Sequence, residues 1–110
     1  MSGAPEPALD LSEILDLYKE DARRTVRTMA LAAERWEEVA SGGAARYDLR
    51  KLSHQLRGSG RTYGFRDVTR ISKAMERIVQ RLEAGALAAD DRVRRALQKK
   101  IERLAQIFAT

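Results

Sequence analysis

The most constraining feature of this 110-residue chain is the absence of proline after residue 7, in a sequence whose apolar residues recur with a helical period. Proline interrupts helices, so its confinement to Pro5 and Pro7 leaves long stretches free to be helical. Four periodic segments follow, separated by short breaks rich in glycine, alanine and aspartate. Amphipathic helices joined by short connections pack most simply side by side. The sequence therefore predicts an all-α fold, an antiparallel four-helix bundle with a long first helix.

The first helix is expected to begin at Asp10, whose side chain can accept from the free amides of the first turn, while Glu13 completes a capping box. It is about 30 residues long by its apolar stripe and ends near the break at 41–43. That stripe comprises Leu11, Ile14, Leu15, Tyr18, Ala22, Val26, Met29 and Trp36. We expect residues 1–9 to form a disordered N-terminal tail and residues 10–110 to form the bundle.

The same period predicts three further helices. The second starts around Tyr47, the third stops before Gly85, and the fourth opens at Asp90 as its N-cap. Glycine suits the left-handed conformation that often follows a helix, so Gly85 marks a helix end. The side chains predicted to face the core are Leu49, Leu52, Leu56 and Tyr63, then Val68, Ile71, Met75, Ile78, Val79 and Leu82, and finally Val93, Leu97, Ile101, Leu104 and Phe108.

Composition limits the classes of function. The chain has no cysteine, which excludes disulfides, thiolate metal sites and a cysteine nucleophile. The first residues lack the apolar core of a signal peptide, and no run approaches the roughly 20 apolar residues that cross a bilayer. We therefore expect a cytoplasmic protein without membrane contact, and a monomer. The formal net charge of +5 favours acidic partners without choosing among them.

His54 is the only histidine, and helical periodicity places it on the side of the second helix opposite the apolar face. Its imidazole is therefore predicted to face outward. Four cations lie within two turns of it on the same helix: Arg50, Lys51, Arg57 and Arg61. Positive charges here would attract and hold a phosphoryl group. The alternative is that His54 is simply a solvated residue on a basic helix face.

Three glycines follow the histidine, Gly58, Gly60 and Gly64, and each would cost about 1 kcal/mol relative to alanine inside a helix. If the helix continues, Gly58 removes the side chain one turn above His54 and lets a partner or a phosphate approach the ring. Alternatively, the glycines end the helix and begin a loop. Composition alone leaves both interpretations open.

The segment from His54 to Phe65, HQLRGSGRTYGF, resembles the signature of the histidine-containing phosphotransfer (HPt) family. That signature has a histidine, a basic residue at +3, glycine at +4, a small residue at +5 and glycine at +10, and all five are present. The Gly64-Phe65 pair is similar to the phosphotransfer domain of chemotaxis histidine kinases. The family often has a glutamate 22 residues after the histidine, which Glu76 matches. Its layout, a long first helix, a histidine helix and two more, covers essentially the whole chain.

The resemblance implies that His54 is phosphorylated on Nε2 and that Arg57 neutralises the phosphoryl oxygens from one turn away. Arg57 departs from the family's usual lysine, because it keeps the charge but offers a planar fork in place of a point charge. Glu76 would hydrogen-bond the other ring nitrogen and fix the tautomer. The alternative for Glu76 is a solvated charge on the flank of the third helix.

The same resemblance implies a phosphoryl carrier in a two-component phosphorelay. His54 would accept phosphate from a receiver-domain aspartate or a histidine kinase and pass it to another receiver domain. The sequence has no P-loop and no acidic cluster suited to Mg²⁺, so we expect no enzyme activity, cofactor or metal in this chain, with Mg²⁺ on the partner receiver. Partners would dock beside the histidine. The residues expected to contact them are Gly58, Arg61, Tyr63, Phe65, Arg50 and Lys51.

Two other functions stay open. A basic helical module could bind the phosphate backbone of nucleic acid. Its cations would be Arg46, Arg50, Lys51, Arg57 and Arg61, with Lys99, Lys100 and Arg103 as a second group. Nucleic acid is the less favoured partner, because aromatic residues make up only 5% of the chain and 16 acidic residues are mixed through the same helices. The third possibility is an HPt-like domain that docks a receiver or kinase without accepting phosphate.

Overall fold

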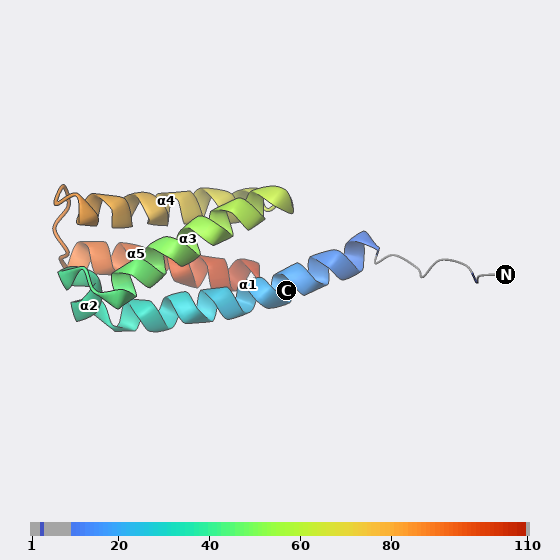
Figure 1. Cartoon of the computed structure of the whole chain (residues 1–110), viewed down its shortest axis with the longest axis horizontal. Helices are drawn as coiled ribbons and strands as arrows, with labels where there is room; N and C mark the ends of the chain where they lie inside the picture. The colour runs from blue at the N-terminus through green and yellow to red at the C-terminus, as the bar shows by residue number, and fades with distance from the viewer. Residues whose placement is uncertain (1–2, 4–9, 110) are drawn as a thin grey trace.

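The computed structural model describes residue 3 and residues 10–109, and Figure 1 shows the described chain as a bundle of helices. The helices are α1 (Leu11–Glu34), α2 (Trp36–Ser41), α3 (Ala44–Thr62), α4 (Arg66–Glu83) and α5 (Asp91–Ile107). The four long helices run antiparallel to their neighbours in sequence, and α2 is a short helix at one end (Figure 1). The prediction of an all-α bundle is confirmed. The predicted N-terminal tail, apart from Gly3, lies outside the described residues.

The first helix starts as predicted but ends early. The Asp10 carboxylate accepts a hydrogen bond from the Glu13 amide at 2.8 Å, which caps α1. After 24 residues the backbone leaves helical geometry at Arg35, with φ −84° and ψ 57°, and α2 follows in a new direction. The Arg35 guanidinium is held there by Glu38 at 3.0 Å and by Asp48 of α3 at 3.3 Å. The expectation of one continuous helix as far as the glycine break is therefore wrong.

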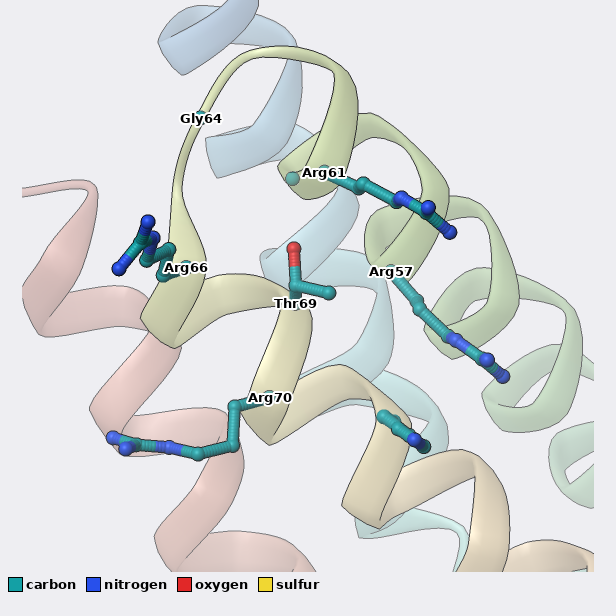
Figure 2. A pocket seen from close by; sticks show the side chains of 8 residues that line it. Arg57, Arg61, Gly64, Arg66, Thr69 and Arg70 are labelled. Carbon is teal, nitrogen blue, oxygen red and sulfur yellow. The ribbon is translucent and has the colours of Figure 1, made fainter.

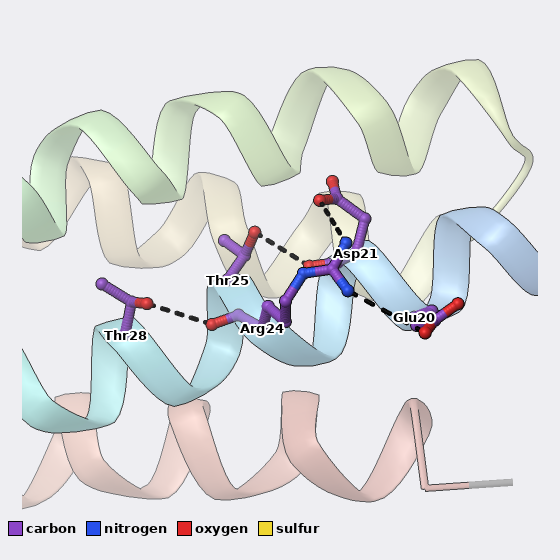
Figure 3. Close-up of polar contacts among 5 residues, drawn as sticks. All are labelled: Glu20, Asp21, Arg24, Thr25 and Thr28. Atoms are coloured by element: carbon purple, nitrogen blue, oxygen red, sulfur yellow. Dashed lines mark hydrogen bonds and ion pairs between the residues drawn. The ribbon is translucent and has the colours of Figure 1, made fainter.

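The outward side of α1 is polar and is held by contacts within the helix (Figure 3). Arg24 lies 3.4 Å from Asp21 and 3.9 Å from Glu20. The hydroxyls of Thr25 and Thr28 each donate to the backbone carbonyl four residues earlier. Exposed pairs of this kind contribute about 0–1 kcal/mol each, so α1 depends mainly on burial of its other face.

The first turns of α1 project beyond the ends of the neighbouring helices (Figure 1). Leu11, predicted to face the core, is consequently 69% exposed, and Leu17 is 54% exposed. The core begins further along α1 with Tyr18 and Ala22, which are both buried. No helix within the described residues is both long and apolar enough to span a membrane.

The interior is filled by the predicted apolar stripes. The largest fully buried apolar side chains are Phe108, Met29, Leu49, Met75, Leu97 and Leu104. The last two helices are bounded as the sequence predicts, since Gly85 adopts φ +70° after α4 and Asp90 accepts from the Val93 amide at 3.0 Å. Tyr63, like Leu11, was predicted to face the core and does not join this interior, because it is 38% exposed.

α3 continues through its glycines to Thr62, so the alternative of a loop after the histidine is wrong. Gly60 lies where α3 packs tightly against α4. A Cβ built on Gly60 would lie 2.9 Å from Thr69 Oγ1 and 3.0 Å from Val68 Cγ1. Gly64, at φ +80°, then closes the turn into α4. Gly60 therefore sets the spacing of the two helices that carry the site.

Gly60→Ala is expected to destabilise the fold by about 1–3 kcal/mol, because the added methyl group overlaps atoms of α4. Gly58→Ala is the matched control on the same helix, where a Cβ would have nothing within 4 Å. That change removes only the entropic cost of glycine and should stabilise by about 0.5–1 kcal/mol. Urea unfolding followed by circular dichroism measures both effects. If both substitutions changed the free energy of unfolding in the same direction, the close packing at Gly60 would be contradicted.

Candidate functional site

His54 lies near the middle of α3 on the side turned to solvent, as the helical period predicts. Its side chain is 75% exposed, while the flanking Ser53 and Leu56 turn inward and are buried. A shallow cavity of about 390 Å³ opens beside the ring. Side chains of α3 and α4 line it, namely Tyr47, Arg50, Lys51, His54, Gln55, Glu76 and Gln80. A molecule can therefore reach the imidazole from outside the bundle.

Glu76 of α4 holds the His54 ring from the buried side of the site. Its Oε2 lies 2.7 Å from His54 Nδ1, and its side chain is only 7% exposed. The helical period of α4 places Met75 and Val79 in the core and Glu76 at the seam with α3. Burial excludes the alternative that Glu76 is a solvated charge. The sequence spacing of 22 residues between histidine and glutamate corresponds here to a direct contact.

Arg57 contacts the second oxygen of the same carboxylate. Its NH1 donates to Glu76 Oε1 at 2.9 Å, and its side chain is 41% exposed. A buried carboxylate needs a partner to offset its loss of hydration, and Arg57 supplies one. The resemblance implied that Arg57 faces the phosphoryl oxygens. In this structure its guanidinium instead faces Glu76, one turn from His54.

The contact with Glu76 selects one tautomer of the neutral ring. An ionised carboxylate can only accept hydrogen bonds, so His54 Nδ1 carries the proton and donates a hydrogen bond to Glu76. Nε2 then keeps its lone pair, and it is the ring nitrogen not engaged by Glu76. The arrangement presents an oriented nitrogen nucleophile on an exposed surface. Glu76 is also placed to stabilise the positive charge that the ring gains when Nε2 forms a bond.

The other cations predicted near His54 differ in whether they form an ion pair within the domain. Arg50 forms an ion pair with Glu83 of α4 at 3.1 Å. Lys51 and Arg61 are exposed on α3 and form no ion pair within residues 10–109. Gly58, one turn beyond His54, leaves open space on the surface, as the absence of any atom near its Cβ position shows.

The two aromatic residues predicted to contact partners belong to a cluster with Tyr18 of α1. Tyr63 stacks on Tyr18 with ring centroids 4.4 Å apart, and the Phe65 ring lies 5.3 Å from Tyr18. Tyr63 keeps 38% of its surface exposed, whereas Phe65 is half-buried and also packs against Phe108. Tyr63 thus remains available to a partner, and Phe65 mainly serves the core.

Tyr18 joins this end of the site although the sequence identified it only as a core residue. Its hydroxyl lies 3.1 Å from Ser59 Oγ on α3. Burial raises the pKa of the Tyr18 hydroxyl above its usual value of 10.0, and the hydrogen bond with Ser59 opposes that shift. No spacing in the sequence relates Tyr18 to Tyr63, because the two meet only through helix packing.

Sequence reasoning also missed three polar residues of the cavity. Tyr47, Gln55 and Gln80 line it together with His54. Two of them carried a usable signal, since Gln55 follows the histidine directly and Gln80 lies one turn after Glu76 on α4. Their amides can donate and accept hydrogen bonds at the open side of the ring.

Comparison with known families gives a match to the Hpt domain over residues 13–107. The match includes the four long helices almost completely, together with His54, Arg57 and Glu76. Comparison with curated proteins and with solved structures gave no match. The family match confirms the resemblance read from the segment that begins at His54. The chain belongs to the Hpt domain family, and with it to the phosphotransfer components of phosphorelays.

Proposed function

We propose that this domain carries a phosphoryl group on His54 Nε2. The group would come from the phosphorylated aspartate of a receiver domain or from a histidine kinase, and would pass to the aspartate of another receiver. The observation that supports this most strongly is the 2.7 Å contact between His54 Nδ1 and Glu76, which leaves Nε2 as the nucleophile. Phosphoryl transfer depends mainly on positioning and electrostatics. The domain is thus proposed as a carrier, with nucleotide and Mg²⁺ held by its partners.

The accepting step can be written with the residues of the site. The Nε2 lone pair of His54 attacks phosphorus, the N–P bond forms, and the P–O bond to the donor aspartate breaks, so that the aspartate leaves as a carboxylate. Nδ1 keeps its proton, and the ring therefore becomes positively charged. Glu76 faces that charge from behind. In the next transfer the aspartate of another receiver attacks phosphorus, and the N–P electron pair returns to the ring.

Arg57 is proposed to neutralise the phosphoryl oxygens once the group is on His54. Its guanidinium lies one turn away and is half-exposed, so a change of side-chain rotamer can bring it to the phosphoryl group. A planar guanidinium forms strong paired hydrogen bonds to phosphoryl oxygens. Its contact with Glu76 then belongs to the unphosphorylated domain.

The proposal is tested by intact-mass measurement after incubation with two donors. One is phosphoramidate, a small donor that needs no docking surface, and the other is a panel of phosphorylated receiver domains. We expect the gain of one phosphoryl group that is lost in acid and retained in alkali, as for phosphohistidine. No gain from either donor would refute the proposal.

Gly58→Leu is expected to slow phosphoryl transfer while it raises the stability of the fold. A long side chain on a helix leans toward the preceding turn, so a leucine at this position would cover His54. Transfer from a phosphorylated receiver should slow by about 10- to 100-fold, because the partner can no longer align with the ring. Stability should rise by about 0.5–1 kcal/mol, since leucine favours helices more than glycine does.

Stopped-flow transfer kinetics and urea unfolding measure these two effects on the same preparation. Labelling by phosphoramidate should fall less than transfer from a receiver, because the smaller donor needs less room. Gly58→Ala serves as the control, with a side chain too short to reach the ring. Receiver transfer at the wild-type rate in Gly58→Leu would show that partners do not approach over this position.

A further inference from the structure

A second groove lies between α3 and α4, beside the turn that joins them (Figure 2). It has a volume of about 580 Å³, and we call it the cationic groove. Five cations line it: Arg57, Arg61, Arg66, Arg70 and Lys73. Thr69 and two glycines supply the rest of its lining, and no carboxylate is among these residues. Figure 2 shows the labelled arginines projecting from both helices around Thr69.

The cationic groove lies next to the histidine site, and Arg57 connects the two. Arg57 belongs to both, because it lines the groove and also donates to Glu76. On α3, Arg57 follows His54 by one turn, and on α4, Lys73 precedes Glu76 by one turn. A protein large enough to bring an aspartate to His54 would therefore also cover at least part of the groove.

The positive charge of the groove is only partly compensated within the domain. Arg57 is paired with Glu76 at 2.9 Å, and Arg70 is paired with Asp67 at 2.8 Å. The other three groove cations, Arg61, Arg66 and Lys73, form no ion pair within residues 10–109. The N-terminus of α4 has no side-chain cap, and its helix dipole adds positive potential at the same end. Like charges held together in this way favour a negatively charged ligand.

We propose that the cationic groove docks an acidic surface of the receiver domain that exchanges phosphoryl groups with His54. This inference rests on the proposed function. A receiver must present carboxylates around its phosphoacceptor aspartate to hold Mg²⁺, so the face that approaches His54 is acidic. Guanidinium groups match carboxylates in geometry as well as charge. Charge complementarity of this kind raises the rate of encounter and selects acidic partners over basic ones.

Nucleic acid fits the cationic groove less well. No aromatic side chain lines it, whereas single-stranded nucleic acid usually binds to aromatic stacking surfaces. The groove also adjoins the exposed carboxylate of Asp67, which would face a phosphate backbone laid along the same seam. A folded partner with discrete acidic groups can meet the cations individually.

The test is a charge-reversal variant with a matched control. The groove variant combines Arg66→Glu and Lys73→Glu, two exposed positions without an ion pair in the described chain. The control combines two equivalent reversals, Arg95→Glu and Lys99→Glu, on exposed positions of α5. α5 packs against α1 and α4, and its control positions are not among the residues that line the groove. Both variants change the net charge equally.

Transfer rates are measured against the concentration of a phosphorylated receiver that labels the wild type. We expect the groove variant to raise KM by about 10- to 100-fold with kcat retained, because steering is lost while the chemistry of His54 is intact. Added salt should raise the wild-type KM, because it screens attraction, and should lower that of the groove variant, because it screens repulsion. The α5 control should keep the wild-type KM, and phosphoramidate should label all three proteins equally.

The outcomes separate this inference from the proposed function. An equal KM in the wild type and the groove variant would overturn the docking proposal. Labelling of His54 by phosphoramidate without exchange with any receiver of the panel would also overturn it, while the phosphoacceptor assignment stands. A titration with duplex DNA completes the test. Salt-dependent DNA binding that the groove variant loses, with an unchanged KM, would identify nucleic acid as the ligand instead.

Discussion

His54→Gln is expected to abolish phosphoryl acceptance from phosphoramidate and from phosphorylated receivers, while helix content and melting temperature stay close to those of the wild type. The chain has no other histidine that could accept the group. The side chain is 75% exposed, and a substitution at such a surface position changes stability by about 0.5 kcal/mol or less. Glutamine keeps the polarity and approximate size of the residue but has no basic nitrogen. Intact mass and circular dichroism measure the two properties on one sample.

The chemical stability of any label that remains on His54→Gln identifies the kind of residue that carries it. Phosphohistidine survives alkali and is lost in acid, whereas an acyl phosphate on aspartate or glutamate is also lost in alkali. A label on His54→Gln that survives alkali and is lost in acid would contradict the assignment of His54. An alkali-labile label would reveal a second acceptor. The rates at which the wild type and His54→Gln are labelled would then show whether His54 is the main acceptor.

Glu76→Gln is the second change with a large expected effect, because it is nearly isosteric and yet reverses the hydrogen bonding of the ring. Arg57 donates at 2.9 Å and needs an acceptor, so the glutamine oxygen should turn toward Arg57. Its NH₂ group then faces His54 Nδ1, which can only accept from it. The ring is forced into the tautomer with the proton on Nε2, and the nucleophilic lone pair is lost.

We expect Glu76→Gln to slow phosphorylation of His54 by about 10- to 100-fold, the range seen when an orienting partner of a functional histidine is removed. Both phosphoramidate and receivers should be affected, since the defect lies in the ring itself. The ¹⁵N chemical shifts of the imidazole report the tautomer directly. A merely structural role for Glu76 would leave those shifts unchanged.

Glu83→Gln is the matched control for this substitution. Glu83 is also on α4 and also pairs with an arginine of α3, Arg50 at 3.1 Å, but it does not contact the ring. Its replacement should leave both the tautomer and the rate of phosphorylation at wild-type values. Equal losses in the two variants would show that helix pairing in general, and not the contact with Nδ1, controls the reaction.

Local signals in the sequence predicted most of the fold and the outward position of His54. Asp10 and Asp90 cap their helices as predicted because a cap depends on only a few neighbouring residues. His54 faces outward as predicted because the helical period is regular through α3. The break at Arg35 was missed, since no glycine or proline marks it and one of the residues that hold it, Asp48, belongs to another helix.

Features that depend on the packing of two helices could not be predicted from the sequence. Gly58 and Gly60 carry the same local cost, and only the packing of α4 shows that one is open and the other enclosed. The family resemblance assigned Arg57 to the phosphoryl oxygens, and its contact with Glu76 became visible only from the packing of α3 against α4. The α4 contribution to the cationic groove was missed for the same reason, because its cations meet those of α3 only in the folded bundle.

The close approach at Gly60 has a consequence for genetics as well as for stability. His54 and Glu76 belong to different helices, so their 2.7 Å contact depends on how far apart those helices are held. Gly60 sets that separation less than two turns from the histidine. In a random mutagenesis screen scored by phosphoryl acceptance, substitutions at Gly60 should therefore be recovered alongside those at His54, although this residue has no functional group of its own.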